Sequence, residues 1–241
     1  MDEEPTLWAY LPFLLGGVPV TLGIAAMAMA LAIPVAFVLA LGRMSRNAPL
    51  RLVAGFVIEL FRGSSSLVQL FWAFYVLPFF GITLPAVAAG VIVLGVNSGS
   101  YLSEVVRAGL LAVPQGQREA ALTLGFSPSY RFFRIILPQA LPLMIPPFGN
   151  AIVTMIKFTS LVSLVTIQDL TFRANLIGTS LGDSGKIYLI VILIYFAINF
   201  TLGHGARALE RFINARSGRG ASTSGETGQS RVPAWALRGA R

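Results

Sequence analysis

Few residues of this chain could carry chemistry, and the most informative of them is a lysine. Lys157 stands in an otherwise apolar stretch and is followed by Thr159 and Ser160. A charge within an apolar span is costly, so its presence there indicates a functional path through the interior. The other polar side chains predicted to line such a path are Asn97 and Tyr101, which lie one helical turn apart, and Asn150. Hydrogen bonding between packed helices is an alternative role for Asn97 and Tyr101.

Catalytic and metal-binding patterns are missing from the sequence. The chain has no cysteine and one histidine, His204, whose nearest acidic residue, Glu210, lies on another helical face. The GDSGK sequence at 182–186 lacks two parts of a phosphate loop, because Ser180 replaces the first glycine and Ile187 replaces the final Ser or Thr. We therefore predict no enzyme activity, no metal and no cofactor in this chain. An intramembrane enzyme is disfavoured for the same reason.

The elements that position these residues are predicted to be membrane-spanning helices. Of the 241 residues, 55% are hydrophobic and only 12% are charged, and the mean hydropathy is +0.75. About 20 apolar residues cross a bilayer, and Gly81 with Pro85 divides the longest uncharged stretch in two. The sequence thus predicts an all-α membrane protein with about five transmembrane helices, near 17–41, 63–80, 85–110, 139–164 and 186–206.

The basic residues predict the orientation of these spans. Of the 18 Lys and Arg residues, 14 follow predicted spans one, three and five, which places them on one side of the membrane. Positive charge is retained in the cytoplasm, so the N-terminus is predicted outside and the C-terminus inside. This asymmetry accounts for the net charge of +8 without nucleic-acid binding. We expect an extracytoplasmic segment at 1–16, a membrane domain at 17–213 and a disordered basic cytoplasmic tail at 214–241.

A polar insert, QREAALTLGFSPSYRFFRIILPQALP, interrupts the apolar pattern between spans three and four. Residues 117–124 are compatible with a helix, Gly125 is a C-terminal stop, and Ser127 with Pro128 begins a second helix. Small residues beside a glutamate let another surface approach the backbone closely. The cytoplasmic loop at about 111–138 is therefore predicted to dock a partner.

The QREAALTLG and IILPQA sequences resemble the EAA loop of membrane subunits of ATP-binding-cassette (ABC) importers. The segments IELFRGSSSLVQLF, LGVNSGSYLSEVVRAGL and TSLVSLV extend the resemblance to the polar amino-acid permease family over about 21–213. The resemblance implies a coupling helix that docks on an ATPase subunit through Gln117, Glu119, Ala120, Ala121 and Gly125. A merely interfacial amphipathic loop is the alternative.

The same resemblance implies a five-span permease of the type I ABC importer kind in a bacterial inner membrane, which imports an amino acid or an amino-acid-like solute. Its implied partners are a second identical or homologous permease, two cytoplasmic ATPases that bind ATP and Mg, an extracytoplasmic binding protein and the lipid bilayer. A stand-alone ion-coupled carrier or channel is the alternative, and the five spans show no inverted repeat to support it.

Two further features bear on the cargo and on packing. Phe158 stands where many related permeases have Asp or Asn, which disfavours a basic substrate, and SLVSLVTIQDLTFRAN resembles permeases for ectoine-type solutes. The pairs Glu104 with Arg107 and Glu59 with Arg62 are each three residues apart, so each is predicted to form an ion pair.

Overall fold

The computed structural model describes residues 10–182 and 184–216, and this part of the chain is helical with short connections. Two segments are π-helical (η2, η4) and two are 3-10 helices (η3, η5). In chain order the elements are α1 Leu11–Leu15, α2 Val18–Arg43, α3 Ala48–Gly63, α4 Ser66–Phe71, η2 Trp72–Val76, η3 Leu77–Phe80, α5 Ala86–Leu111, α6 Gln115–Thr123, α7 Pro128–Tyr130, η4 Arg131–Ile136, α8 Leu137–Phe158, η5 Thr159–Val165, α9 Leu170–Leu181 and α10 Ser184–Arg216.

Four helical segments are long and apolar enough to cross a membrane: Leu11–Arg43, Ala86–Leu111, Pro128–Val165 and Ser184–Ile213. A fifth candidate consists of Ala48–Gly63 and Ser66–Phe80, which meet at an angle of 105°. The predicted all-α architecture with about five spans is confirmed. The span predicted near 63–80 corresponds to α4, η2 and η3, but the prediction missed α3, which precedes it and ends at a sharp break after Gly63.

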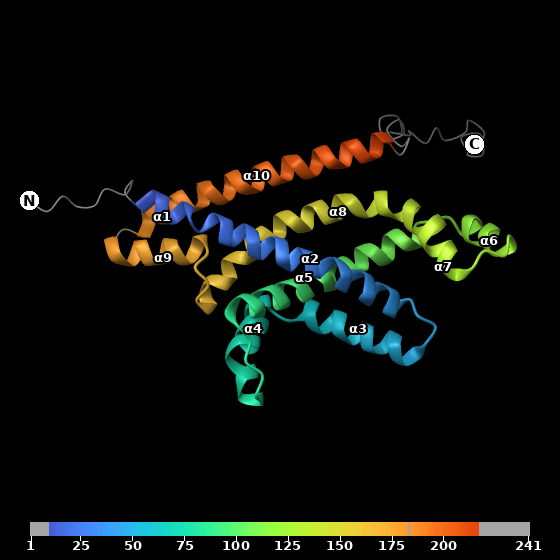
Figure 1. Ribbon diagram of the computed structural model, residues 1–241, viewed down its shortest axis with the longest axis horizontal. Helices are drawn as coiled ribbons and strands as arrows, with labels where there is room; N and C mark the ends of the chain where they lie inside the picture. Colours follow the sequence, from blue (N-terminus) through green and yellow to red (C-terminus); the bar gives the residue numbers. More distant parts are fainter. Residues whose placement is uncertain (1–9, 183, 217–241) are drawn as a thin grey trace, which may run out of the picture.

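The break between α3 and α4 is held by side-chain hydrogen bonds. Ser64 and Ser65 are extended, which leaves carbonyl groups of α3 without helical partners. Gln69 Nε2 donates to the Phe61 carbonyl at 3.0 Å, and Asn97 Nδ2, from α5, donates to the same carbonyl at 2.9 Å. Asn97 also donates to Gln69 Oε1 at 3.1 Å. These bonds allow α4 to turn away from α3 (Figure 1).

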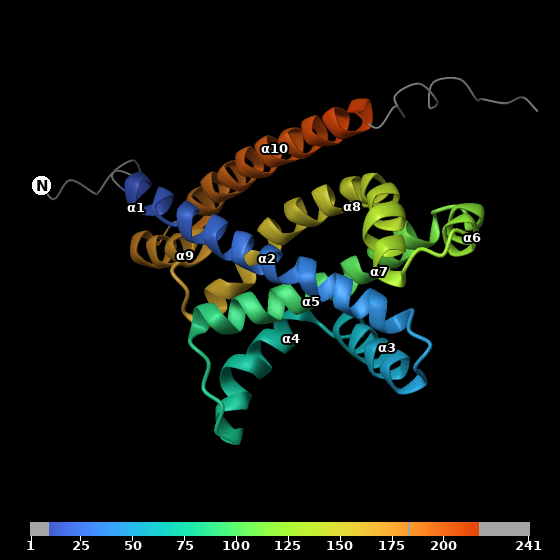
Figure 2. The same cartoon turned by 45° about the vertical axis from the view of Figure 1, so that its right-hand side comes forward.

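Helices α2 and α5 lie side by side at the centre of the molecule in both views (Figures 1 and 2). A Cβ atom at Gly99 would lie 2.7 Å from Val35 Cγ1, and one at Gly95 would lie 3.0 Å from the Ala28 carbonyl oxygen. The first separation is shorter than real Cβ contacts and the second is tighter than most of them, so a side chain at either position would press on α2. The small residues thus let the two backbones pack closely.

The remaining helices define two ends of the molecule. The α6 end contains α6, α7 and the 44–47 loop, and the α9 end contains α1 and α9 (Figure 1). Arg173 of α9 donates to the Phe13 carbonyl at 2.8 Å, which joins α9 to α1. Helix α10 continues to Arg216, so the predicted tail is wrong at 214–216, and its remainder lies outside the described residues.

Candidate functional site

The polar insert forms two short helices joined at Gly125. Gly125 has a φ of +73°, the left-handed region that favours glycine. Its N–H donates to the Leu122 carbonyl at 3.0 Å, and the N–H of Phe126 donates to the Ala121 carbonyl at 3.3 Å. This pair of bonds is the Schellman pattern that ends helices at a glycine. The predicted glycine stop after α6 is therefore confirmed.

The second predicted boundary is also confirmed, because Ser127 Oγ accepts a hydrogen bond from the Tyr130 N–H at 3.3 Å as an N-cap. Arg118 donates to the Leu110 carbonyl and so attaches α6 to the end of α5. Of the five residues predicted to couple to an ATPase, Ala121 is buried against the body of the protein. The other four, Gln117, Glu119, Ala120 and Gly125, are exposed at the α6 end.

Tyr101 and Asn150, both predicted to line a path, border one cavity of about 470 Å³ between α5 and α8. The Tyr101 hydroxyl donates to the Arg62 carbonyl at 3.2 Å, and the Arg62 guanidinium lies 5.4 Å from the centre of its ring. Phe158 forms part of the same wall. The cavity is mainly apolar with a few polar groups, as expected for a small-molecule site.

The other predicted path residues do not border this cavity. Asn97 is only 2% exposed, and its amide nitrogen donates to the groups at the α3–α4 break. Lys157 is exposed on the last turn of α8, and its carbonyl accepts a hydrogen bond from Ser160 Oγ at 2.8 Å. Thr159 is fully buried and donates to the Ile156 carbonyl at 2.7 Å.

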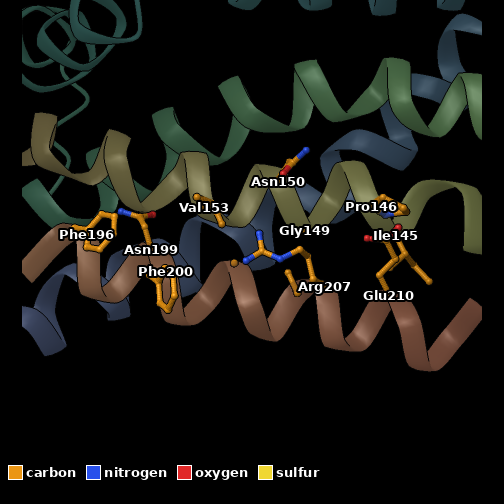
Figure 3. A pocket seen from close by; sticks show the side chains of 12 residues that line it. Ile145, Pro146, Gly149, Asn150, Val153, Phe196, Asn199, Phe200, Arg207 and Glu210 are labelled. Carbon is orange, nitrogen blue, oxygen red and sulfur yellow. The ribbon is translucent and has the colours of Figure 1, made fainter.

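A second cavity, of about 480 Å³, lies between α8 and α10 (Figure 3). Its polar groups include Asn199, Arg207 and Glu210 of α10, which sequence reasoning did not assign to a site. Asn150 also borders this cavity, although Figure 3 shows its side chain pointing away from α10. The spacing of Arg207 and Glu210, three residues apart on one helix, was the available signal for this polar cluster.

An ion-pair network joins α2, α3 and α5 near the α6 end. Arg107 and Glu104 pair at 2.8 Å, which confirms that prediction. Glu59 pairs with Arg43 of α2 at 3.3 Å, so the predicted partner Arg62 is wrong. The reason is that α3 packs against α2, which brings Arg43 within reach of both Glu59 and, at 3.6 Å, Glu104.

Asp169, between η5 and α9, is a fully buried carboxylate. Its Oδ1 accepts from the Phe172 N–H at 2.8 Å and caps α9, whereas Oδ2 is buried with no hydrogen-bond partner among the described residues. Burial raises the pKa of Asp169 from 3.8 to about 6, against the lowering effect of the backbone N–H groups. The folded protein therefore binds a proton here more tightly than the unfolded chain does.

Replacing Asp169 by asparagine is expected to remove a pH-dependent loss of stability. Because the folded pKa exceeds the unfolded one, the wild-type free energy of unfolding falls as pH rises from about 4 to 6 and stays low above that. Two pKa units correspond to about 3 kcal/mol. Asparagine keeps the capping oxygen without the charge. Thermal unfolding of both proteins from pH 4 to 8 should show the wild type losing stability relative to Asp169→Asn, and parallel curves would contradict this.

Comparison with known proteins identifies the family. Residues 32–215 match the family described as the inner membrane component of binding-protein-dependent transport systems. The chain belongs to this family. It is 42% identical over 180 residues to a probable amino-acid ABC transporter permease of Sinorhizobium fredii, covering 72% of this chain and 76% of that protein. It is 38% identical to the L-cystine transport system permease TcyB of Bacillus subtilis, covering 84% and 87% of the two chains.

Two solved structures of ABC transporters contain chains with a similar fold. A crystal structure of an amino acid ABC transporter with histidines matches the permease with a TM-score of 0.79 and 34% identity, over 88% of this chain and 99% of that one. An inward-facing methionine ABC transporter, MetNI, shares the fold at a TM-score of 0.63 and 22% identity, over 86% and 99% of the chains.

The protein is thus a multi-pass inner-membrane permease subunit of an ABC importer for amino acids. It works in a complex with ATPase subunits, and these subunits bind ATP and carry out its hydrolysis. The permease itself is neither an enzyme nor a cofactor-binding protein, as the sequence predicted.

Proposed function

We propose that this permease pairs with a second identical or homologous permease, two ATPases and an extracytoplasmic binding protein. The observation that carries this proposal is the exposed α6 helix at one end of a bundle of spans, ended by Gly125 in the left-handed conformation. Four of the five coupling residues are exposed there, so a partner can reach them. Closure of the two ATPases would move the docked helices and switch access to the path between the two sides.

The α6 end is proposed to be cytoplasmic, with the N-terminus outside and the C-terminus inside. Support comes from the basic residues at this end, which include Arg43, Arg46 and Arg51 around the 44–47 loop and Arg118, Arg131 and Arg134 around α6 and α7. Cytoplasmic loops carry such an excess of positive charge. This orientation puts α6 on the side where ATP is available.

The substrate is proposed to be an amino acid or a close derivative that passes along the α5–α8 cavity. Tyr101 and Asn150 supply hydrogen-bonding groups, and Phe158 supplies an apolar wall in place of an acidic residue. Asn97, Lys157, Thr159 and Ser160 do not border this cavity and remain predicted path residues. Relatives are named for L-cystine and for octopine. None of the relatives named here is an ectoine permease, so the ectoine-type resemblance stays a prediction without support.

Transport in proteoliposomes tests this function. The permease, reconstituted with its ATPase and binding-protein partners, is expected to accumulate a labelled amino acid with ATP inside the vesicles and no ion gradient. A nonhydrolysable ATP analogue should stop uptake at a single turnover, and an ionophore should leave it unchanged. Uptake that needs a sodium or proton gradient and ignores ATP would instead support the stand-alone carrier.

A further inference from the structure

A cavity of about 590 Å³ lies between α2, α3 and α5, close to the 44–47 loop. Three arginines, one from each helix, border it: Arg43, Arg51 and Arg107. Leu52, Gly55 and Phe56 of α3 line the same space. We call it the arginine cavity. It is separate from the α5–α8 cavity, from the α8–α10 cavity and from α6.

The charges around the arginine cavity do not balance. Arg43 and Arg107 share two acidic partners, Glu59 and Glu104, through the ion pairs described above. Arg51 lies in no ion pair in the described part of the chain, and its Nη1 makes a long hydrogen bond of 3.4 Å to the Ser45 carbonyl. The cavity is therefore left with one formal positive charge in excess, carried by Arg51.

The start of α3 adds to this positive character. Asn47, the N-cap residue, makes no side-chain capping bond, and the first turn contains no acidic residue. The N-terminus of a helix has a partial positive charge, so Arg51 near this end is unfavourable on its own. An anion next to Arg51 would offset this positive character, because arginine binds phosphate well.

The rim of the arginine cavity is apolar and faces outward. Leu52 is 71% exposed and Phe56 is 67% exposed. Helix α3 lies at the outer edge of the bundle, with α2 and α5 on its inner side (Figure 2). In a membrane protein such an exposed apolar face contacts lipid chains. A free phosphate ion would leave this rim unused, whereas a phospholipid would place its phosphate on the arginines and an acyl chain along Leu52 and Phe56.

We infer that the arginine cavity is a binding site for an anionic phospholipid, held through its phosphate by Arg51 with Arg43 and Arg107. This inference goes beyond transport itself and depends only on the membrane location, not on the docking of α6. Arg51→Gln is the decisive variant, because Arg51 has no acidic partner that its loss would leave unpaired. Arg46→Gln is the matched control, since Arg46 is an exposed arginine in the neighbouring 44–47 loop and does not border the cavity.

Native mass spectrometry of the full chain in detergent, titrated with phosphatidylglycerol or phosphatidylcholine, measures the binding. The wild type should retain phosphatidylglycerol in preference. Arg51→Gln should weaken that retention about fivefold, the factor that roughly 1 kcal/mol per arginine represents, and Arg46→Gln should leave it unchanged. Equal losses in the two variants, or equal retention of the two lipids by the wild type, would overturn the inference.

Two further measurements separate the possible causes. Gly55→Leu fills the cavity without changing the charge, and a Cβ atom at Gly55 meets only Arg43 Nη1, at 4.0 Å. It should reduce phosphatidylglycerol retention if the cavity itself holds the lipid, and full retention would contradict the site. Inorganic phosphate at a few millimolar should not displace the lipid. Displacement would identify a site for free anions instead. Size-exclusion profiles confirm that each variant is folded.

Discussion

Replacing Gly125 by valine is expected to reduce ATP-driven uptake roughly tenfold or more, while the permease still inserts in the membrane. A β-branched residue in the left-handed region costs on the order of 1 to 3 kcal/mol. No atom lies within 4 Å of the position of an added Cβ, so the strain arises from the backbone conformation and not from a clash at Cβ. The Schellman bonds that end α6 would break or the helix would turn, and in either case its exposed residues would lose their arrangement for docking. Alanine should be less harmful than valine, and asparagine the mildest replacement.

The measurement is co-purification of the ATPase with each variant, together with ATP hydrolysis and uptake in proteoliposomes. Gly182→Val is a matched control, because Gly182 also has a positive φ, +66°, and open space around it, but lies after α9. This control imposes the same backbone strain at the other end of the molecule, so it should leave ATPase association intact. If Gly125→Val binds the ATPase and transports at the wild-type rate, α6 is not a coupling element.

Gly99→Ala is expected to lower the free energy of unfolding by about 1 to 3 kcal/mol, the usual effect of overpacking a tight interface. The added methyl group would lie 2.7 Å from Val35 Cγ1 and 3.0 Å from the Ala32 carbonyl oxygen. Because one of these atoms belongs to the backbone of α2, the two helices would have to separate. Separation at this point would loosen the contact between the two central helices of the bundle.

The matched control is Gly23→Ala in α2, where no atom lies within 4 Å of the added group. Alanine is a better helix former than glycine, so this variant should raise stability by up to about 1 kcal/mol. Thermal unfolding of both variants in detergent measures the difference. A Gly99→Ala protein as stable as Gly23→Ala would show that α2 and α5 are less closely packed than described here.

Local signals in the sequence were sufficient where the structure depends on neighbouring residues. The stop at Gly125 and the cap at Ser127 follow from residue types within one turn, and both were predicted. The uncharged stretches likewise located four of the spans. The bend after Gly63 was missed because it depends on Asn97, which is 36 residues from the Phe61 carbonyl that it binds. Helix α3 was also missed, because it contains charged residues and precedes the uncharged stretch that was used to locate the span.

Sites built from several helices were only partly predictable. Asn150 and Tyr101 were selected individually for their polarity, but their shared cavity depends on how α5 and α8 pack. For Glu59, the spacing of three residues along one helix favoured Arg62 as the ion-pair partner. In the folded protein the partner is Arg43, which comes from a different helix. Tertiary packing determines which side chains share a cavity or form an ion pair, and local sequence patterns do not indicate that packing.

The short connection between α5 and α6 has a mechanical consequence. Only residues 112–114 separate these helices, Val113 is buried, and the Pro114 carbonyl accepts the Gln117 N–H at 3.1 Å. Arg118 adds a second attachment, to the Leu110 carbonyl. Because this connection is short and attached at two points, a displacement of α6 is transmitted to α5 and is not absorbed by a flexible loop. Helix α5 therefore acts as a stiff rod, with α6 at one end of it.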